Sequence, residues 1–420
     1  MTKIDHISFG QTQISSIPEE WEFVRLGDGE MCQIVMGQSP PSSTYNKLQE
    51  GLSFLQGNME FGEIYPSPSI YCSEPIKIAE KNDVLISVRA PVGEVNISSS
   101  KVCIGRGLAA IRCKPNKISD LFLFYHLKYI GEKLESISSG STFKAIRKND
   151  LDQLKILLPP IPEQKKIAEI LSTVDQAIEK VDEAIEKTQR LKKGLMQELL
   201  TKGIGHKEFK DTEIGRIPKD WNIVRISDIA DVKGGKRLPK GQKLINSKTP
   251  YPYIRVLDFK NMGVDVSNIQ FLLPETHKSI KQYIISSDDV YISIAGTVGV
   301  VGLIPFELDN ANLTENAAKL CNLRDVNKEF LAYVLNSSIG QSQISSYLGK
   351  AQQPKLALFR IEKIKLPLPP LSEEQKIAEV LSAVDERLEL LRKRKERLER
   401  VKKGLMNDLL TGRKRVGLEV

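Results

Sequence analysis

The hydrophobic pattern along this chain predicts two long helices at equivalent places in its two halves. In residues 158–201 apolar side chains recur at alternating spacings of four and three residues, and residues 368–411 repeat the pattern in the same phase, interrupted by Lys395. Such spacing is typical of a coiled-coil seam, whereas a globular helix presents a broader apolar face. We therefore predict a helix-pairing seam formed by Ile167, Leu171, Val174, Ile178, Val181, Ile377, Leu381, Val384, Leu388 and Leu391.

The ends of both helices carry recognisable signals. Paired prolines at 159–160 and 369–370 end an extended segment, so a helix should begin directly after each pair. Ser372 is expected to cap the second helix, with Gln375 at the third helical position. Helix-ending glycines are expected at positions 203, 205 and 412.

A glycine inside each helix is less easily explained. Gly194 and Gly404 occupy identical Lys-Lys-Gly-Leu-Met settings, although glycine in a helix costs about 1 kcal/mol relative to alanine. Their recurrence suggests a close backbone approach or a bend, and shared ancestry alone is the alternative.

The orientation of the predicted pair is open at this level. A whole globular half separates the two helices, so parallel and antiparallel arrangements are both compatible with the connections. Antiparallel pairing would place the globular parts at opposite ends of a rod, and parallel pairing would place both at one end.

The second half of the chain is a diverged copy of the first. Residues 158–201 and 368–411 align without a gap, with 23 of 44 positions identical. Trp21 and Trp221, each preceded by an Ile-Pro pair, are aligned at a different offset, so insertions lie inside the globular parts. We expect both tryptophans to anchor the start of a domain rather than stack on bases. The repeated segments are alike in the two halves, whereas the globular parts between them differ. This suggests that the two domains recognise two different targets.

The globular part of each half is predicted to contain both strands and helices. Short β-rich runs at 84–88 and 108–113 are broken by Gly, Pro and Ser clusters, and residues 121–136 and 328–337 look helical. The predicted class is α+β, with two α/β domains separated by two long helices and internal pseudo-two-fold symmetry. We place the first domain at 1–157, the central helical region at 158–203, the second domain at 204–367 and the C-terminal helical region at 368–420.

Composition narrows the setting. Five cysteines without a C-x-x-C pair indicate reduced thiols in a cytoplasmic protein, and four scattered histidines give no metal motif, so we expect no bound metal. No signal peptide or bilayer-spanning stretch is evident. The net charge of +8 suggests a polyanionic partner. However, residues 387–415 hold twelve Lys/Arg against four Asp/Glu, and a charged helix face is usually only solvated.

Catalytic signatures are missing from the sequence. No Asn/Asp-Pro-Pro-aromatic loop of an amino-methyltransferase is present, and the glycine- and lysine-rich stretch at 234–242 lacks the spacing of a phosphate loop. No Ser-His-Asp, metal-hydrolase or paired-carboxylate pattern stands out. These observations predict a chain that binds and positions while other subunits do the chemistry.

Taken together, the motifs closely resemble the specificity (S) subunit of type I restriction-modification systems. The resemblance covers essentially the whole chain. One departure is that the second helix starts with Ser372-Glu-Glu where the first has Pro162-Glu-Gln. The motifs are the paired Leu-Pro-Pro helix starts with Lys-Ile-Ala-Glu, both Lys-Lys-Gly-Leu-Met ends, the paired Ile-Pro-x-x-Trp segments, and the segments at 37–45, 89–93 and 104–108.

The resemblance implies a non-catalytic, DNA-binding role. Each domain would read one half of a bipartite site through loops that enter the major groove, as in the recognition domain of adenine methyltransferases. The helices, antiparallel, would fix the unread spacer and dock two methyltransferase (M) subunits. Those subunits would use S-adenosylmethionine to methylate adenine N6, and restriction (R) subunits would use ATP and Mg²⁺ to translocate and cut DNA.

Candidate DNA-contacting residues follow from side-chain chemistry. Base edges are read by bidentate side chains, and phosphates are held by cations and hydroxyls. The candidates are Gln56, Asn58, Arg89, Arg106, Thr142 and Lys144 in the first domain, and Lys236, Arg237, Lys240, Arg255, Asp258, Lys260, Gln352, Gln353 and Lys355 in the second.

Two other classes of protein compete with this interpretation. A scaffold, in which a coiled coil presents two protein-binding modules, would show no DNA sequence preference even with partner subunits present. An enzyme in its own right would transfer methyl groups or cut DNA as a purified chain.

Overall fold

The structure, a computed structural model, describes residues 8–9, 12–13, 17–131, 145–348 and 354–417. It combines helices with sheets, which confirms the predicted α+β class. The chain divides into two compact units: the first unit comprises residues 1–183 and 393–420, and the second comprises residues 184–392. The long helices α4 (Ile161–Lys202) and α10 (Leu371–Leu409) each contribute residues to both units.

Both long helices begin directly after the paired prolines, as predicted. Gly203 follows the last residue of α4 with φ of +66°, the left-handed conformation expected of a helix-ending glycine. The predicted capping role of Ser372 is wrong. The amides of Glu373 and Glu374 donate to the carbonyl of Pro370, so the helix already includes Leu371 and Ser372 is its second residue.

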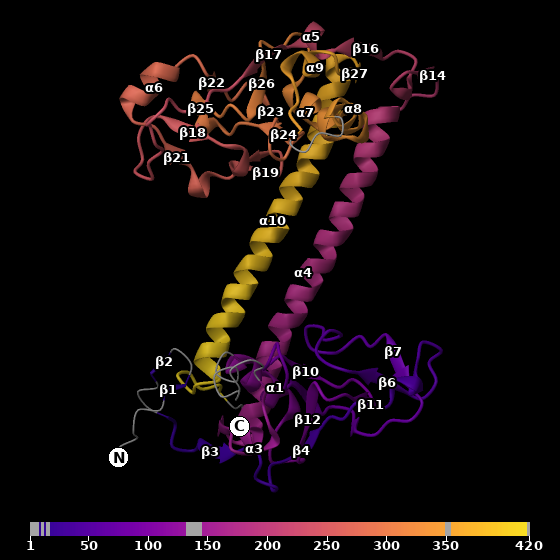
Figure 1. The fold of residues 1–420 in the computed structure, drawn as a ribbon, viewed down its shortest axis with the longest axis vertical. Coiled ribbons are helices and arrows are strands. Elements are labelled where there is room, and N and C mark those ends of the chain that lie inside the picture. The colour runs from indigo at the N-terminus through magenta and orange to yellow at the C-terminus, as the bar shows by residue number, and fades with distance from the viewer. Residues whose placement is uncertain (1–7, 10–11, 14–16, 132–144, 349–353, 418–420) are drawn as a thin grey trace. The chain divides into compact units, whose positions relative to one another are not determined.

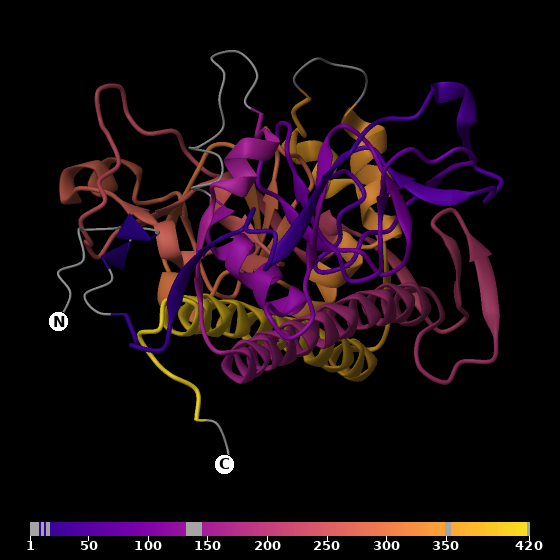
Figure 2. The same ribbon diagram turned by 90° about the horizontal axis from the view of Figure 1, so that it is seen from below.

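Within each unit, α4 and α10 run antiparallel and side by side (Figures 1 and 2). In the first unit Asp175 pairs with Lys402 at 2.5 Å and Asp182 with Lys395 at 2.7 Å, so numbers rise along α4 as they fall along α10. In the second unit Lys192 pairs with Asp385 at 2.6 Å. Lys395, which interrupts the heptad pattern, therefore meets a carboxylate on the other helix.

The predicted seam lies on the inner sides of the helices. Ile167, Leu171 and Val181 are buried on α4, and Val174 and Ile178 are half-buried. Both ends of the seam also join a domain core: Ile167 and Leu171 pack within the core of the first domain. The buried α10 residues are Ile377, Leu381, Leu388 and Leu391, the first two within the core of the second domain, and Val384 is half-buried.

Gly194 and Gly404 do not mark a close backbone approach. Within the described residues, and leaving aside the adjoining helix backbone, no atom lies within 4 Å of a Cβ built on either glycine. The predicted close approach is therefore wrong, whereas the bend and shared ancestry stay as the explanations that the sequence offered.

The first domain is built on an antiparallel four-stranded sheet in the order β10-β9-β12-β4, covered by α1. In a second sheet, ordered β5-β7-β6-β11-β8, β11 runs parallel to β6. β3 pairs with β13 and β1 with β2. The elements are β1 (Ser8–Phe9), β2 (Thr12–Gln13), β3 (Glu22–Arg25), β4 (Cys32–Met36), η1 (Ser42–Thr44), β5 (Tyr45–Asn46), β6 (Leu52–Leu55), β7 (Ile70–Cys72), β8 (Ile78–Ala79), β9 (Val84–Ser87), β10 (Val95–Ile97), β11 (Val102–Ile104), β12 (Leu108–Cys113), α1 (Asp120–Tyr129), α3 (Lys148–Asp152) and β13 (Lys155–Leu158).

The second domain repeats this plan. Its main sheet has the order β17-β26-β23-β24, its second sheet has the order β21-β18-β25-β22, and β16 pairs with β27. β18 runs parallel to β25, as β6 does to β11. The elements are β14 (Phe209–Thr212), β15 (Gly215–Pro218), β16 (Asn222–Arg225), α5 (Ile226–Ile229), β17 (Asp231–Gly234), β18 (Pro252–Ile254), η2 (Val256–Asp258), β19 (Phe259–Lys260), β20 (Gly263–Val264), η3 (Val266–Asn268), β21 (Gln270–Phe271), α6 (Pro274–Ile280), β22 (Ile284–Ile285), β23 (Val290–Ser293), β24 (Val301–Leu303), η4 (Phe306–Leu308), β25 (Ala311–Leu313), β26 (Ala317–Cys321), α7 (Lys328–Asn336), α8 (Ser338–Leu348), α9 (Leu358–Glu362) and β27 (Lys365–Leu368).

The patterns that predicted strands and helices in the domains hold well. The β-rich runs at 84–88 and 108–113 form β9 and β12, neighbours in the main sheet with almost entirely buried side chains. The predicted helices at 121–136 and 328–337 correspond to α1 and α7. Residues 132–136 of the first prediction lie outside the described residues.

Candidate nucleic-acid interface

In the first domain, backbone hydrogen bonds gather the candidate-bearing loops at the ends of strands from both sheets. The loop after β4 is held by Gly37 N donating to Leu108 O at 2.9 Å and Gln38 N donating to Ile104 O at 3.0 Å. A Cβ at Gly37 would clash with the carbonyl oxygen of Gly105, which is why only glycine fits there.

Three more loops join the same place. Gly107 N donates to Gln56 O at 3.2 Å, and Val88 N donates to Gly107 O at 2.8 Å. Ile146 N in turn donates to Val88 O at 2.9 Å. We call these segments, residues 37–39, 56–58, 88–89, 105–107 and 145–146, the first loop cluster.

The second domain builds an equivalent cluster with most of the same bonds. Lys236 N donates to Leu313 O at 2.8 Å, as Gln38 does to Ile104. Ile294 N donates to Asn316 O at 2.8 Å, and Leu356 N donates to Ile294 O at 2.9 Å. Residues 235–237, 255–257, 294–295, 314–316 and 355–356 form this second loop cluster.

The structure brings together three of the first-domain candidates. Gln56, Arg89 and Arg106 are exposed and lie on three different segments of the first loop cluster. Asn58 is half-buried, and its carbonyl accepts from Phe61 N in a turn. Thr142 and Lys144 lie outside the described residues.

Exposed cations dominate the second-domain candidates. Lys236, Arg237 and Lys355 lie on the second loop cluster, with Lys240 and Lys260 nearby in the chain, and all five are exposed. Gln352 and Gln353 lie outside the described residues.

Two of these cations already have partners. Arg237 pairs with Glu315 at 2.7 Å, and Lys260 pairs with Asp265 at 3.2 Å. Hydrogen bonds from Ser267, together with Lys260, lower the pKa of Asp265 to about 2. That carboxylate therefore stays charged near neutrality and competes with any phosphate for the Lys260 ammonium group.

Arg255 and Asp258 are held by each other, which differs from the other candidates. The guanidinium donates to both carboxylate oxygens, at 3.0 and 2.7 Å, and also to the side chain of Gln270. Asp258 is only 2% exposed and Arg255 is half-buried. This pair shapes the loop after β18, and its donors and acceptors are engaged within the domain.

Sequence reasoning missed Gln38. Its exposed side chain occupies the position that Lys236 holds in the other cluster, because both backbones make the same bond to the strand beside them. Aligning the Gly37-Gln38 loop with the Gly235-Lys236 loop as repeats would have found it.

A Tyr-Asp-Lys triad, largely buried in the first unit and more exposed in the second, ties each domain to both long helices, and the sequence analysis also missed it. Tyr125 of α1 donates to Asp175 at 2.7 Å, and Asp175 pairs with Lys402. Burial raises the pKa of the Tyr125 hydroxyl, which keeps it protonated as a donor. The counterpart in the second unit is Tyr333, Asp385 and Lys192. The repeated Val-Asp of the two helices, at 174–175 and 384–385, was the available signal.

Both tryptophans anchor their domains, as expected. Trp21 is 5% exposed and donates to Glu163 at 3.0 Å, and Trp221 is fully buried and donates to Glu373 at 3.1 Å. Each glutamate also contacts a second side chain, and this partner differs between the units. Arg415 donates to Glu163 in the first unit, and the His206 ring contacts Glu373 in the second.

One anchor changes character between the copies. Gln164 accepts from Ser119 N at 2.8 Å and donates to Pro159 O at 2.8 Å. Its counterpart, Glu374, accepts from Asn327 N at 2.7 Å, but its Oε1 is buried with no hydrogen-bond partner among the described residues. Burial raises the pKa of Glu374 to about 7, because the charged form loses solvent. The departure of Ser372-Glu-Glu from Pro162-Glu-Gln at the two helix starts therefore has a physical consequence.

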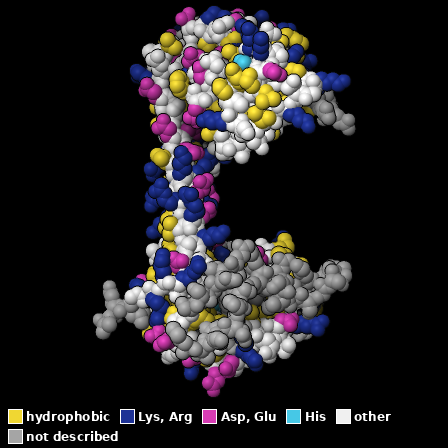
Figure 3. All heavy atoms as spheres, turned by 90° about the vertical axis from the view of Figure 1, so that its left-hand side faces the viewer, with side chains coloured by type: hydrophobic (Ala, Val, Ile, Leu, Met, Phe, Trp, Pro, Cys, Tyr) yellow, Lys and Arg dark blue, Asp and Glu magenta, His cyan; other side chains and the backbone are white. Residues whose placement is uncertain are grey.

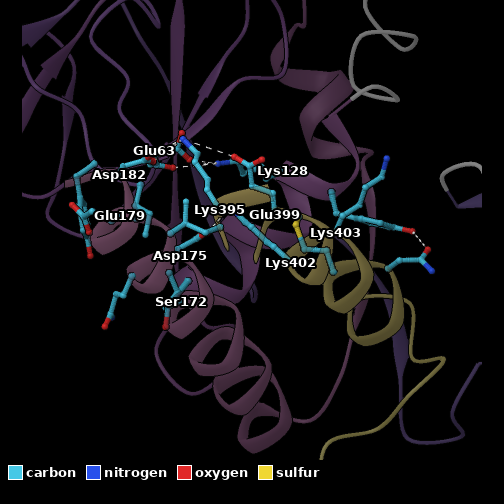
Figure 4. A pocket seen from close by; sticks show the side chains of 18 of the residues that line it. Glu63, Lys128, Ser172, Asp175, Glu179, Asp182, Lys395, Glu399, Lys402 and Lys403 are labelled. Carbon is cyan, nitrogen blue, oxygen red and sulfur yellow. Dashed lines mark hydrogen bonds and ion pairs between the residues drawn. The ribbon is translucent and has the colours of Figure 1, made fainter. Parts of the chain in front are cut away.

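A groove in the first unit lies between the domain and the helix pair (Figure 4). Three of its four lysines pair with carboxylates: Lys395 with Asp182, Lys402 with Asp175 and Lys128 with Glu63 at 3.5 Å. On the face shown in Figure 3, Lys and Arg side chains are likewise interspersed with Asp and Glu over the helices. The groove therefore has mixed charge and is a poor match for a polyanion.

Among the helices that the structure describes, none combines the length and the apolar character needed to cross a bilayer.

Comparisons with known proteins agree with this geometry. The family described as the type I restriction modification DNA specificity domain matches residues 18–187 and 218–400. A Methanocaldococcus jannaschii protein named for the type I restriction enzyme MjaX is 51% identical over 197 residues, 47% of this chain and 46% of that protein, so this match spans about half of the relative. The MjaVIII specificity subunit of the same organism is 30% identical over 409 residues, 95% of this chain and 94% of that protein.

A solved structure shares the fold. The crystal structure of the type I restriction-modification S subunit from Mycoplasma genitalium matches with a TM-score of 0.64 at 18% identity, covering 96% of this chain and 98% of that chain. The repeat, the paired helices, the two family matches and the near full-length relative lead to one conclusion. The chain belongs to the family of type I restriction-modification specificity subunits.

Proposed function

We propose that this chain is the DNA sequence-specificity subunit of a type I restriction-modification complex, in which each domain reads one half of a bipartite site. The observation that carries the proposal is the pair of loop clusters. Their backbones are held by equivalent hydrogen bonds, while the side chains they present differ. Two similar supports with different side chains suit two different half-sites.

The two loop clusters differ at exposed positions, where a side chain could contact a base edge. Gln38 is matched by Lys236, Arg89 by Ala295 and Arg106 by Glu315. In the major groove each base pair offers its own pattern of donors and acceptors, so side chains of different hydrogen-bonding type select different bases. The exposed lysines of the second domain would add phosphate contacts that hold register without reading sequence.

The helices are proposed to set the spacer between the half-sites and to dock the methyltransferase subunits. α4 has 42 residues and α10 has 39, and each continues without a break from one unit into the other. A continuous helix of that length measures about 60 Å at roughly 1.5 Å per residue. The Tyr-Asp-Lys triads support this role, because each couples a domain to both helices.

The chemistry is assigned to partner subunits. Two methyltransferase subunits would supply adenine-N6 methylation with S-adenosylmethionine, and restriction subunits would use ATP and Mg²⁺ to translocate and cut DNA. The chain itself would bind none of these cofactors and would act on double-stranded DNA by positioning those enzymes.

The primary test maps methylated adenines in DNA from cells that carry this subunit with its methyltransferase partners. The proposal expects a single bipartite sequence with an unread spacer. Exchanging the first domain for that of another family member should change one half of the sequence and leave the other half unchanged. Methylation without sequence preference would favour the scaffold alternative.

The spacer is tested by shortening both helices in register. Asp182 faces Lys395, so deleting residues 182–188 together with 389–395 removes facing heptads and keeps both triads. Seven residues span about 10 Å, so the spacer should shorten by about three base pairs. Binding should also weaken, because three base pairs turn the duplex by roughly a third of a helical repeat. An unchanged spacer would refute the role of the helices.

A further inference from the structure

We infer that Met59 and Leu257 are matched apolar contacts to thymine methyl groups, one in each half-site; this inference rests on the proposed function. The two residues occupy the same place in the loops that follow β6 and β18. The segments read Met59-Glu60-Phe61 and Leu257-Asp258-Phe259. Ser67 N donates to Glu60 O at 2.8 Å, and Asp265 N donates to Asp258 O at 2.8 Å, so the backbones are equivalent.

Each apolar side chain points outward from a loop whose following residues are fixed inward. Phe61 packs against a buried cluster of the first domain, and Phe259 stacks on Tyr291 with ring centroids 3.7 Å apart. In contrast, Met59 is 95% exposed and Leu257 is 73% exposed. Neither contributes appreciably to a core, so folding alone does not account for an apolar residue at both positions.

The surroundings identify the ligand group. Met59 directly follows the 56–58 segment of the first loop cluster, which carries the exposed Gln56, and Leu257 is the last residue of the 255–257 segment of the second loop cluster. An apolar side chain makes no favourable contact with a charged phosphate. The 5-methyl group of thymine, by contrast, is the apolar group that DNA presents in the major groove. Methionine and leucine are suited to cover it, because both bury apolar surface without leaving an unsatisfied polar atom.

The test replaces thymine by deoxyuridine, which lacks only this methyl group. The complete complex with methyltransferase subunits is titrated with its mapped site, one thymine being replaced at a time. For the unmodified complex, affinity should fall about fourfold at one thymine of each half-site, the loss expected for one methyl group left unburied. In Met59→Ala the effect should vanish in the first half-site only, and in Leu257→Ala in the second only.

Controls separate this contact from general apolar stickiness. Met59→Leu and Leu257→Met should keep the sensitivity, since both replacements are apolar. Leu48→Ala and Phe306→Ala remove side chains that are 77% and 86% exposed and should leave binding unchanged. All these variants should fold, because each side chain is largely in solvent.

Two outcomes would overturn the inference. Affinity could be insensitive to deoxyuridine at every thymine, or Met59→Ala and Leu257→Ala could retain the full sensitivity of the unmodified complex. Weaker binding of both alanine variants with deoxyuridine sensitivity unchanged would indicate a wedge between base steps and would equally overturn the thymine assignment. Failure of the unmodified complex to prefer any bipartite site would instead refute the proposed function, so the two failures are distinguishable.

Discussion

The two loop clusters differ in the side chains they present and agree in the bonds that hold them. Gly37 and Gly235 both lie against a carbonyl that leaves no room for a Cβ, and each starts a loop fixed to the neighbouring strand. At the exposed positions, however, Arg89 is matched by Ala295 and Arg106 by Glu315. Because the backbone bonds need no particular exposed side chain, the readout residues are free to change while the support stays the same.

The residues that join each domain to the long helices are more alike in the two units than the exposed loop residues, but they are not identical. Both Tyr-Asp-Lys triads are kept, but Asp175 is 9% exposed and Asp385 is 30% exposed on their side chains. Gln164, with its amide satisfied, is matched by Glu374, with a buried carboxylate oxygen unpaired among the described residues. The two supports are therefore alike in geometry and unequal in energy, which the following experiments measure.

The largest effect is expected from Asp175→Ala. It leaves the Lys402 charge and the Tyr125 hydroxyl without an acceptor in a site where Lys402 is only 14% exposed. Loss of one partner of a buried pair costs about 3 to 5 kcal/mol of unfolding free energy. Asp385→Ala should cost less, about 1 to 2 kcal/mol, because its pair is more exposed. Urea unfolding, with hydrogen exchange to assign the unit affected, measures both.

The control for this prediction is Asp182→Ala, whose carboxylate pairs with Lys395 in a more exposed setting. It should cost less than about 1 kcal/mol. Equal losses in the three variants would show that burial does not distinguish these ion pairs.

Glu374→Gln should remove a pH dependence from the second unit. The folded carboxyl keeps its proton up to a pKa of about 7, whereas the unfolded chain releases it near 4.5. Raising pH between these values therefore destabilises the fold, by about 3 kcal/mol at most, with the full penalty present above pH 7. Glutamine supplies a neutral amide at every pH, as Gln164 does in the first unit. Unfolding free energies at pH 5 and pH 8 should converge in the variant, with the gain at pH 8.

The reciprocal change sharpens the comparison. Gln164→Glu should introduce the same loss of stability with rising pH into the first unit. A Glu374→Gln variant as pH-dependent as the unmodified protein would refute the assignment to this carboxyl.

Arg89→Ala and Arg255→Ala should fail in different ways. Arg89 is exposed, so its loss should weaken DNA binding of the assembled complex by about 1 to 3 kcal/mol and leave unfolding unchanged. Arg255→Ala leaves Asp258, 2% exposed, without its guanidinium partner and should lower the unfolding free energy as well. Binding titrations and thermal unfolding of the same preparations separate the two. Unchanged affinity and site preference in Arg89→Ala would remove that residue from the readout.

The smallest effect is expected from Gly194→Ala and Gly404→Ala. Each added Cβ meets open space within the described part of the chain, so each variant should gain up to about 1 kcal/mol of unfolding free energy. A gain in the free subunit together with weaker assembly with methyltransferase subunits would assign the glycines to partner docking. A loss of stability would contradict the geometry.

Much of the architecture could be predicted from the chain by periodicity and repetition. The heptads identified α4 and α10, and the paired prolines placed their starts, because both signals are local. The alternation of apolar runs with turn residues located β9 and β12. The predicted capping role of Ser372 is wrong because the helix starts two residues earlier, at Leu371, and which carbonyl receives the first amides is not encoded in the capping pattern.

The sequence by itself determined the elements, the duplication and the family, since these follow from spacing and from residue types along one line. Only the tertiary structure decided which side chains meet. Arg255 and Asp258 looked like readers until their mutual bonds were seen, while Gln38 and the Tyr125–Asp175 contact went unnoticed. Such contacts form when side chains come within a few ångströms of each other in space. The number of residues between them in the chain does not determine that distance.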